Sequence, residues 1–455
     1  MDAQHLTSFT LEHLTQAALV RSVLAAALQA ADPYQAVRSA LRRTGDLLKV
    51  DEQIYPLKNF QKIYVIGAGK AAYPMALAVE DILGDYLTNG LMITKEGHLP
   101  PQPALRRAHI LEAGHPLPDE RGVEATRRML HLLDNTTADD LVFCLISGGG
   151  SALMTAPAEG VSLSDLQQLT NILLRCGASI AQINTLRKHL DQVKGGGLAR
   201  RAAPARLCTL ILSDVVGDPL ETIASGPTVP DAGTFQDAWK VLELFSLLDE
   251  TPQGILSYLR RGLQGEAAET LKPGDPIFQR VQNVLAASNA QAANAAAERA
   301  RRLGFHTLRL TTFLQGEARQ AGMLLAAIAR QIHASAEPLS RPACLITGGE
   351  TTVTVRGSGK GGRNQELVLG AVEGLAQVPQ SLLISLATDG GDGPTDAAGA
   401  VASDATLPRA RALGLEPQDF LNRNDAYRFF EPLGDLLKTG PTRTNVNDLQ
   451  FLFVF

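Results

Sequence analysis

Lys70 is the residue of this chain whose surroundings point most directly to chemistry. It lies in the turn Gly67-Ala-Gly-Lys-Ala-Ala72, between the apolar stretch 63–66 and an apolar helical pattern. The N-terminal end of a helix repels cations, so a lysine there is best explained by an anionic ligand that it shares with backbone N–H groups. The turn also fits the loose dinucleotide fingerprint G-x-G-x-x-[GA]. We therefore expect an anion-binding turn at Lys70.

A second glycine-rich turn, Ser147-Gly-Gly-Gly-Ser151, follows the apolar run 141–146. Consecutive glycines permit positive φ and let another group approach the bare backbone. A row of free N–H groups in such a turn can cradle an oxyanion or a phosphate. Gly148, Gly149, Gly150 and Ser151 are the candidate residues.

The strand and turn of this second motif recur about two hundred residues later, where 343–350 aligns with 143–150. Two further pieces, a Lys-Gly-Gly run and an Asp-rich strand end, follow each copy in the same order, which indicates two related α/β halves. After the second copy comes Gly359-Lys-Gly-Gly-Arg-Asn-Gln-Glu366, at the start of a helix expected over 367–375. Arg363 can bind a carboxylate or phosphate through two parallel hydrogen bonds, and Asn364 lies beside it.

Carboxylates follow several of the apolar strands. This position suits a magnesium ion that bridges phosphates, or a base that takes a proton from an attacking hydroxyl. Cations, a metal and an oriented hydroxyl are together what phosphoryl transfer requires. The acidic set consists of Asp214, Asp218, Glu350, Asp389, Asp392 and Asp396.

Alternating strands and helices predict an α/β fold with a parallel, doubly wound sheet and a site at the carboxyl ends of its strands. Helices over 10–31 and 33–48 are expected to cover this first domain, which should end near residue 235. The second domain, 236–455, should open with helices between 236 and 262 and a strand at 283–287. It should end with a strand within 442–455 that docks into its sheet. The strands expected in the first domain are 63–66, 90–95, 108–113, 141–146 and 207–212.

Composition restricts the class of protein. With 455 residues and a net charge of −5, the chain has no global basic field, so nucleic acid and anionic membranes are poor partners. No basic and apolar leader and no run of about 18 apolar residues is present, which makes the cytoplasm the expected location. The four cysteines lack metal-ligand spacing and should be free thiols, three of them within strands: Cys144, Cys176, Cys208 and Cys344.

Together these motifs resemble the class of glycerate 2-kinases whose C-terminal part is the MOFRL domain. The resemblance runs from about residue 10 to the C-terminus and rests on VIGAGKA, CLISGGGSAL, HLDQVKGGGLA, SDVVGDP, LITGGETTVTV, GKGGRNQE and ATDGGDGPTDAAGA. It implies transfer of the γ-phosphoryl group of ATP to the 2-hydroxyl of D-glycerate. It also implies a Rossmann-like N-terminal domain, a smaller C-terminal α/β domain and an active site in the cleft between them.

The family's cleft lysine and arginine correspond to Lys70 and Arg363, which are expected to hold the glycerate carboxylate and the transferring phosphoryl group. The nucleotide is expected on the Gly148–Ser151 turn, with Asp218, Glu350 and Asn364. Asp214 and Asp389 are both candidates for binding Mg²⁺ and for accepting the hydroxyl proton. The oligomeric state, a homodimer included, stays open.

Two other functions remain compatible with the motifs. Some family members carry the name hydroxypyruvate reductase, and the G-x-G-x-x-A turn would suit an NAD(P)H enzyme. Such an enzyme normally has an acidic residue at the end of the second strand, where this chain has Lys95 and then Glu96. A sugar-phosphate sensor would keep the glycine-rich turns but would have little use for the acidic set.

Overall fold

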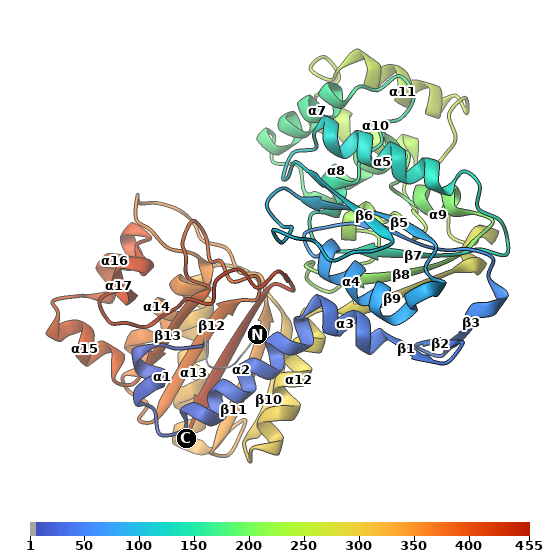
Figure 1. Ribbon diagram of the computed structural model, residues 1–455. Helices are drawn as coiled ribbons and strands as arrows, with labels where there is room; N and C mark the ends of the chain where they lie inside the picture. The colour runs from blue at the N-terminus through green and yellow to red at the C-terminus, as the bar shows by residue number, and fades with distance from the viewer. Residues whose placement is uncertain (1–5) are drawn as a thin grey trace. The chain divides into compact units, whose positions relative to one another are not determined.

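The computed structural model describes residues 6–455 and forms two compact units (Figure 1). The parallel-sheet unit comprises Pro33–Ser213 and Asp218–Ala286. The mixed-sheet unit comprises the described residues up to Asp32, the short segment Asp214–Gly217, and Ala287–Phe455. The expected α/β class with two domains is confirmed, but the units divide the chain elsewhere than at residue 235.

The parallel-sheet unit is built on six strands in the order β6-β5-β4-β7-β8-β9. The four pairings from β6 through to β8 are all parallel. Numbered along the chain, the order is 3-2-1-4-5-6, that of a doubly wound sheet whose direction switches between β4 and β7. Its strands are β4 Ile63–Ala68, β5 Asn89–Lys95, β6 Ala108–Ala113, β7 Leu141–Ile146, β8 Arg206–Leu212 and β9 Val281–Ala287.

Residues 236–286 belong with this first sheet for two physical reasons. β9 forms its edge, so the strand expected to open the second domain completes the first. The helices before β9 share an apolar core with those that precede β8. They are α7 Leu163–Arg175, α8 Ile180–His189, α10 Phe235–Leu244 and α11 Gln253–Leu263.

The prediction of a helix over 33–48 is wrong in its second half. α3 covers Pro33–Ala40, and a three-stranded antiparallel sheet follows. Gly45 has φ +60 and opens a tight turn, while Leu48 and Val50 alternate with exposed residues, which is a strand period rather than a helical one. The strands are β1 Leu41–Thr44, β2 Leu47–Val50 and β3 Gln53–Pro56.

The sheet of the mixed-sheet unit has the order β10-β11-β15-β12-β13-β14. The expected terminal strand is confirmed as β15 Asp448–Val454, and it lies at the centre of the sheet, antiparallel to both neighbours. Since this sheet is mixed and the first is parallel, the likeness of the two halves does not extend to sheet topology. The other strands are β10 His306–Leu314, β11 Ala343–Gly349, β12 Ser381–Ala387, β13 Gly399–Ser403 and β14 Leu436–Leu437.

The N-terminal helices pack in this unit and not, as expected, on the parallel sheet. α1 Phe9–His13 and α2 Ala17–Ala31 precede Asp32, and α2 packs along α12 Asn289–Arg302. Thr10 N–H donates to Asp435 Oδ1 at 2.8 Å, and the Thr444 hydroxyl to Ala31 O at 2.5 Å, which fixes both helices. The remaining core lies between the strands and α13 Ala318–Ser335 and α14 Arg363–Leu375.

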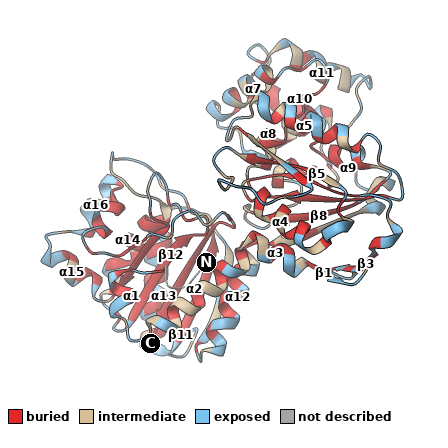
Figure 2. Ribbon diagram, in the orientation of Figure 1, coloured by how far each residue is buried: buried red, intermediate tan, exposed pale blue. Residues whose placement is uncertain are grey.

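Both sheets are buried throughout most of their length (Figure 2). The prediction of free thiols is confirmed: all four cysteines are unpaired, with Cys144, Cys208 and Cys344 buried in strands. Within residues 6–455, no helix is long and apolar enough to cross a membrane.

Candidate active site

The Lys70 turn and the Ser147–Ser151 turn lie side by side at the switch point of the parallel sheet. β4 and β7 are neighbours, so the segments that leave their carboxyl ends meet. Lys70 N–H donates to Gly148 O at 2.9 Å, and Ala71 N–H to the Ser147 hydroxyl at 3.0 Å. The two glycine-rich turns predicted separately from the sequence therefore form one structure.

Gly69 is required where these turns touch. Its φ is +150, and a Cβ placed on it would lie 2.0 Å from Ser147 Oγ. Any side chain larger than hydrogen would push the turns apart.

We expect Gly69→Ala to destabilise the protein by at least about 2 kcal/mol, because it adds a steric clash to an unfavourable backbone conformation. Gly97→Ala is the matched control: Gly97 also has positive φ, +78, but nothing lies within 4 Å of its added Cβ. Urea unfolding of both variants measures the difference. Equal losses in the two would show that the contact with Ser147 carries no cost.

The side chain of Lys70 has no hydrogen-bond or ion-pair acceptor among residues 6–455. Its stem passes Gly149, whose added Cβ would lie 3.6 Å from Lys70 Cγ and 3.0 Å from His115 Cδ2. His98 Nδ1 lies 3.2 Å from Lys70 O. The lysine is thus flanked by two histidines, and its ammonium group is available to a ligand.

Both histidines favour the neutral form. Burial, which is the largest cause, and the positive charges of Lys70 and Lys95 together lower the pKa of His115 to about 4. Burial also lowers the pKa of His98, although its bond to Lys70 O opposes this shift. At neutral pH the local positive charge therefore belongs to the lysines.

His115 should make the protein less stable as the pH falls from about 6.5 to about 4. The unfolded chain takes up the proton near pH 6.5 and the folded one near pH 4, so acid favours unfolding across this window. Because His115 is only half-buried, we expect a loss of no more than about 2 kcal/mol. Urea unfolding between pH 7 and 4 should show a shallower decline for His115→Asn and an unchanged one for the exposed control His109→Asn.

The acidic residue that a nicotinamide enzyme needs is absent from the end of β5. Lys95 ends the strand, and Glu96 Oε2 accepts a hydrogen bond from Arg121 Nη2 at 2.8 Å. Arg121 also bonds Asp119. Glu96 is thus engaged on the surface, which weighs against the reductase alternative.

Ser151 is tied into a short chain of polar groups. Its Oγ lies 2.9 Å from Ser225 Oγ, and the Ser225 hydroxyl donates to Asn184 Oδ1 at 3.0 Å. Ala224 and Ser225 both have left-handed backbone, with φ +49 and +61. Two such non-glycine residues in succession store strain, which proteins retain chiefly at functional sites.

Asp214 and Asp218 lie in the segment after β8 but fall in different units. Asp214 is half-buried and belongs to the mixed-sheet unit, whereas Asp218 belongs to the parallel-sheet unit and has φ +56. Gly217 lies against the Phe313 ring near the end of β10, where Leu314 O accepts the Glu350 N–H at 2.8 Å. Gly217, which follows Asp214 by three residues, and Glu350 are therefore both placed near the end of β10.

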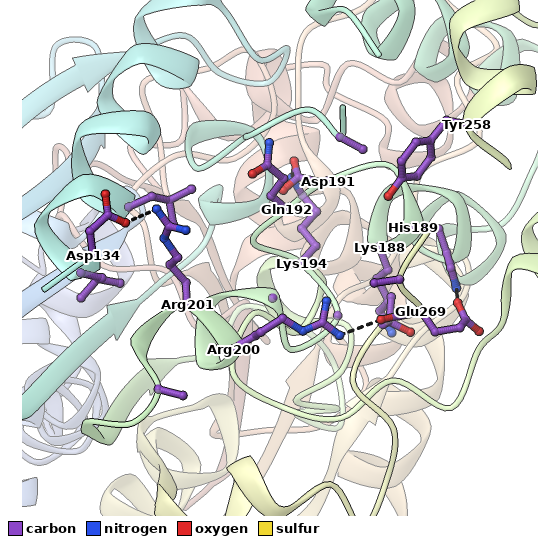
Figure 3. Close-up of a pocket in the computed structure, with 18 residues that line it drawn as sticks. Asp134, Lys188, His189, Asp191, Gln192, Lys194, Arg200, Arg201, Tyr258 and Glu269 are labelled. Atoms are coloured by element: carbon purple, nitrogen blue, oxygen red, sulfur yellow. Dashed lines mark hydrogen bonds and ion pairs between the residues drawn. The ribbon is translucent and has the colours of Figure 1, made fainter. Parts of the chain in front are cut away.

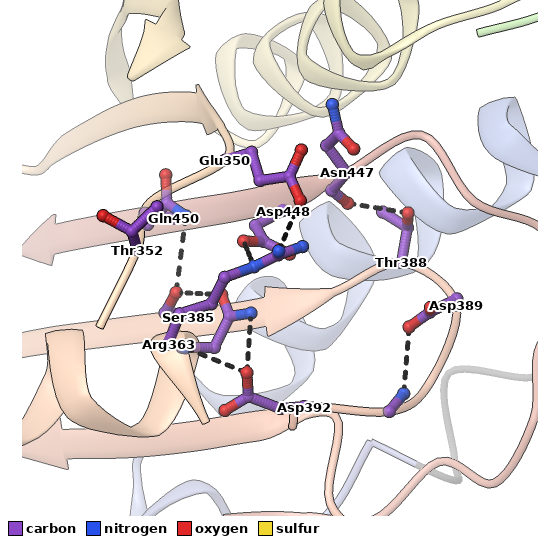
Figure 4. Close-up of polar contacts among 12 residues, drawn as sticks. Glu350, Thr352, Arg363, Ser385, Thr388, Asp389, Asp392, Asn447, Asp448 and Gln450 are labelled. Atoms are coloured by element: carbon purple, nitrogen blue, oxygen red, sulfur yellow. Dashed lines mark hydrogen bonds and ion pairs between the residues drawn. The ribbon is translucent and has the colours of Figure 1, made fainter. Parts of the chain in front are cut away.

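Arg363 is the centre of a second cluster, in the mixed-sheet unit (Figure 4). Its guanidinium donates to both oxygens of Asp448, at 2.6 and 3.1 Å, and to Glu350 Oε1 at 2.5 Å. Asp448 begins β15 and pairs with the last residues of its two neighbours, Gly349 of β11 and Ala387 of β12. The side chains of Arg363, Glu350 and Asp448 therefore meet at the carboxyl ends of β11 and β12.

Asp448 is almost fully buried and its side chain is 1% exposed. Burial raises the pKa of Asp448 to about 6, although Arg363 acts in the opposite direction. Glu350 is more open, with 43% of its side chain exposed. A ligand can therefore reach Arg363 from the Glu350 side.

Asn364 and Asp392 hold the start of α14. Asp392 accepts the backbone N–H groups of Asn364 and Gln365 at 3.1 and 2.9 Å and so caps the helix. Asn364 is buried, and its Oδ1 accepts the Ser385 hydroxyl at 2.5 Å. Its side chain is thus occupied by protein groups, and its geometry suits positioning Arg363 more than touching a nucleotide.

Asp389 is half-buried in the turn after β12, and its Oδ1 accepts the Gly391 N–H at 3.0 Å. No group of three or more His, Cys, Asp or Glu side chains in the described chain could hold a metal ion by itself. A magnesium ion carried by phosphates needs only one or two carboxylates. Asp389, with one carboxylate oxygen not bonded to protein in this range, fits that requirement.

The sequence-predicted residues thus form two groups. Lys70 and Gly148–Ser151 come together in the parallel-sheet unit, and Arg363, Glu350 and Asn364 in the mixed-sheet unit. Two contributors were missed: Asp448 and the Ser225–Asn184 pair. Asp448 could have been found from the sequence, because an Asp directly before an apolar terminal strand is unusual. Nothing in the local sequence indicated the Ser225–Asn184 pair.

Comparison with known proteins identifies the family. A model described as Domain of unknown function (DUF4147) matches residues 19–260, and the MOFRL family model matches 343–448. A glycerate 2-kinase of Pyrococcus horikoshii is 44% identical over 94% of this chain and 95% of its own. A D-glycerate 2-kinase of Thermotoga maritima is 43% identical over 88% of this chain and 92% of its own. A relative from Agrobacterium vitis, 39% identical over 96% of this chain and 94% of its own, is named for hydroxypyruvate reductase instead.

Solved structures agree. The crystal structure of glycerate kinase from Thermotoga maritima superposes with a TM-score of 0.87 at 40% identity, covering 96% of this chain and 99% of that one. A crystal structure from Pyrococcus horikoshii gives 0.88 at 43% identity, with coverages of 96% and 98%. The resemblance inferred from the motifs is confirmed, and the chain belongs to the glycerate 2-kinase family.

Proposed function

We propose that this protein transfers the γ-phosphoryl group of ATP to the 2-hydroxyl of D-glycerate, giving 2-phosphoglycerate and ADP. The observation that carries the proposal is the ammonium group of Lys70, which has no protein partner within residues 6–455 and belongs to the switch point of a chain from the glycerate 2-kinase family. Open α/β sheets bind ligands at this point. Phosphoryl transfer relies on cations placed around the moving charge rather than on covalent chemistry.

Lys70 and Arg363 hold the glycerate carboxylate and the phosphoryl group in this proposal. Gly148, Gly149, Gly150 and Ser151 bind the nucleotide through backbone N–H groups and a hydroxyl, with Asp218 beside them. Glu350 and Asp448 orient the Arg363 guanidinium, since each accepts one or more of its hydrogen bonds. Asn364 contributes by fixing the start of α14 through Ser385 and Asp392.

Asp389 and Asp214 share two tasks. One is to bind Mg²⁺, which when bound neutralises phosphate charge, and the other is to accept the proton of the 2-hydroxyl. Both residues belong to the mixed-sheet unit. We assign the pair to these tasks without choosing between them, and D389N and D214N, tested at several Mg²⁺ concentrations, separate the roles. Added Mg²⁺ should rescue only the variant that lost a metal ligand.

The reaction itself is tested with the purified protein, D-glycerate and Mg-ATP, with ADP release as the readout. Enolase added to the product separates 2-phosphoglycerate, which it dehydrates, from the 3-phospho isomer, which it does not. A parallel reaction with hydroxypyruvate and NADH tests the reductase. ADP release that depends on glycerate supports the proposal, and NADH oxidation without it contradicts the proposal.

The proposal includes a cytoplasmic location, for which four free cysteines are suitable. It involves no nucleic acid or membrane partner. A homodimer is the assembly to test, by light scattering during size-exclusion chromatography. A mass near 48.5 kDa would contradict the dimer.

A further inference from the structure

A small cavity lies beside Ser151 in the parallel-sheet unit. Its volume is about 40 Å³, room for roughly three water molecules or for one carboxylate or phosphoryl group. Leucines of α7 and α8 form most of its apolar wall. Its polar lining consists of Ser151, Thr155, Thr170, Arg187, Asp191 and Lys194.

Arg187 is the unusual member of this lining. It lies on α8, half-buried beside the leucines of the cavity wall, and burial lowers the pKa of its guanidinium while nearby Asp191 opposes that shift. Within residues 6–455 it makes no hydrogen bond and no ion pair. A partly desolvated guanidinium without protein acceptors has its donors free for an anionic ligand that enters the cavity.

The neighbouring cations are in a different situation. Lys194 donates to Asp191 Oδ2 at 2.5 Å and to Met154 O at 3.3 Å, and Lys188 donates to Asp231 at 3.1 Å. The Asp191–Lys194 pair lines the small cavity and also a larger cavity of about 470 Å³. The pair therefore lies between the two cavities.

The larger cavity is also rich in charge (Figure 3). There Arg200 donates to Glu269 O at 2.7 Å, Arg201 pairs with Asp134, and His189 faces Glu269 at 3.0 Å. Arg200 and Arg201 therefore have protein partners, whereas Arg187 has none within residues 6–455.

The polar chain around Ser151 connects Arg187 to the candidate active site. Asn184, which accepts the Ser225 hydroxyl, precedes Arg187 by three residues on α8, so both side chains leave the same face of the helix. Ser225 in turn contacts Ser151 at 2.9 Å. The strained Ala224–Ser225 backbone belongs to the same group and holds the Ser225 hydroxyl against Ser151, which lines the cavity.

We propose that Arg187 binds an oxyanion in this cavity, next to the Ser147–Ser151 turn. This inference rests on the proposed function, because it gives the oxyanion a source in the reaction: the carboxylate of glycerate or a phosphate of the nucleotide. Both present two or more oxygens to the planar guanidinium fork.

The test uses Arg187→Met, which keeps an apolar stem but removes the guanidinium and its charge, and Arg187→Lys, which keeps the charge. Arg175→Met is the matched control, since Arg175 is exposed at the end of α7 and has no ion pair within residues 6–455. Calorimetry measures the affinities of each protein for D-glycerate, for Mg²⁺ with a non-hydrolysable ATP analogue, and for inorganic phosphate.

For Arg187→Met we expect an affinity loss of at least about tenfold for one of the two reaction ligands, and a smaller loss for Arg187→Lys. Weaker glycerate binding identifies the carboxylate as the oxyanion, and weaker nucleotide binding identifies the phosphate. The unliganded Met variant should unfold at the same or a higher temperature than the parent, since it loses a half-buried unpaired charge.

Affinities of Arg187→Met within twofold of the parent for all three probes would overturn the oxyanion site, as would a parent protein that binds none of them. Failure of the proposed function looks different. The parent would then release no ADP with glycerate, while the Arg187 variant could still lose phosphate affinity relative to the Arg175 control.

Discussion

Lys70→Met should lower kcat/KM for D-glycerate and ATP by at least about a hundredfold, because one cation at the reacting phosphate or carboxylate contributes several kcal/mol in a dry site. The expectation follows from the switch-point geometry, where the Lys70 stem passes Gly149 and its ammonium has no protein acceptor in the described chain. Methionine keeps the apolar stem, so the turn should remain folded. Steady-state kinetics with ADP detection measures the loss.

Lys62→Met is the control for this experiment, since Lys62 is exposed at the opposite end of the same strand. Its turnover should stay within about twofold of the parent, as is usual for surface substitutions. Near-normal turnover of Lys70→Met would remove Lys70 from the mechanism. A loss confined to KM would assign the lysine to ground-state binding instead.

Arg363→Met should have two separable effects. The first is a loss of stability of about 2–4 kcal/mol, because the buried Asp448 loses both of its arginine hydrogen bonds. The second is a loss of kcat of at least about a hundredfold, because the cation assigned to the transferring group is gone. Thermal or urea unfolding measures the first effect, and steady-state kinetics the second.

The double variant Arg363→Met with Asp448→Asn distinguishes these effects. Asparagine has no charge to bury, so the double variant should recover most of the lost stability while its turnover stays low. Recovery of turnover together with stability would mean that Arg363 only holds the fold. No change of stability in the single variant would contradict the structural importance of the Arg363–Asp448 pair.

The local sequence was sufficient to predict those strands and turns whose residues form a clear apolar run or a glycine-rich motif. The apolar runs that became β4 and β7 were long enough to identify, and glycine-rich turns directly behind them could only meet if both strands were parallel neighbours. The prediction for segment 41–56 was wrong for the opposite reason. Its strands are only four residues long, too short to show a clear period, and the helical pattern before them was extended too far.

Residues of the candidate site could be predicted where a charged side chain lies in a glycine-rich turn. They could not be predicted where a contact is made by a segment distant in the sequence. Lys70 and Arg363 were found in this way. Asp448 becomes a partner of Arg363 only because the terminal strand inserts beside β11, 85 residues away in sequence from the arginine. Asn364 was assigned to the ligand because of its neighbours, although tertiary packing commits its side chain to Ser385.

The central position of β15 has a consequence for biosynthesis. β15 completes the mixed sheet, while α1 and α2 of the same unit are made long before it. During translation the parallel-sheet unit can close once β9 has been made, but the sheet of the other unit stays incomplete until β15 has been made. A nonsense mutation before Asp448 therefore removes the middle of a sheet and leaves β11 and β12 without their shared neighbour.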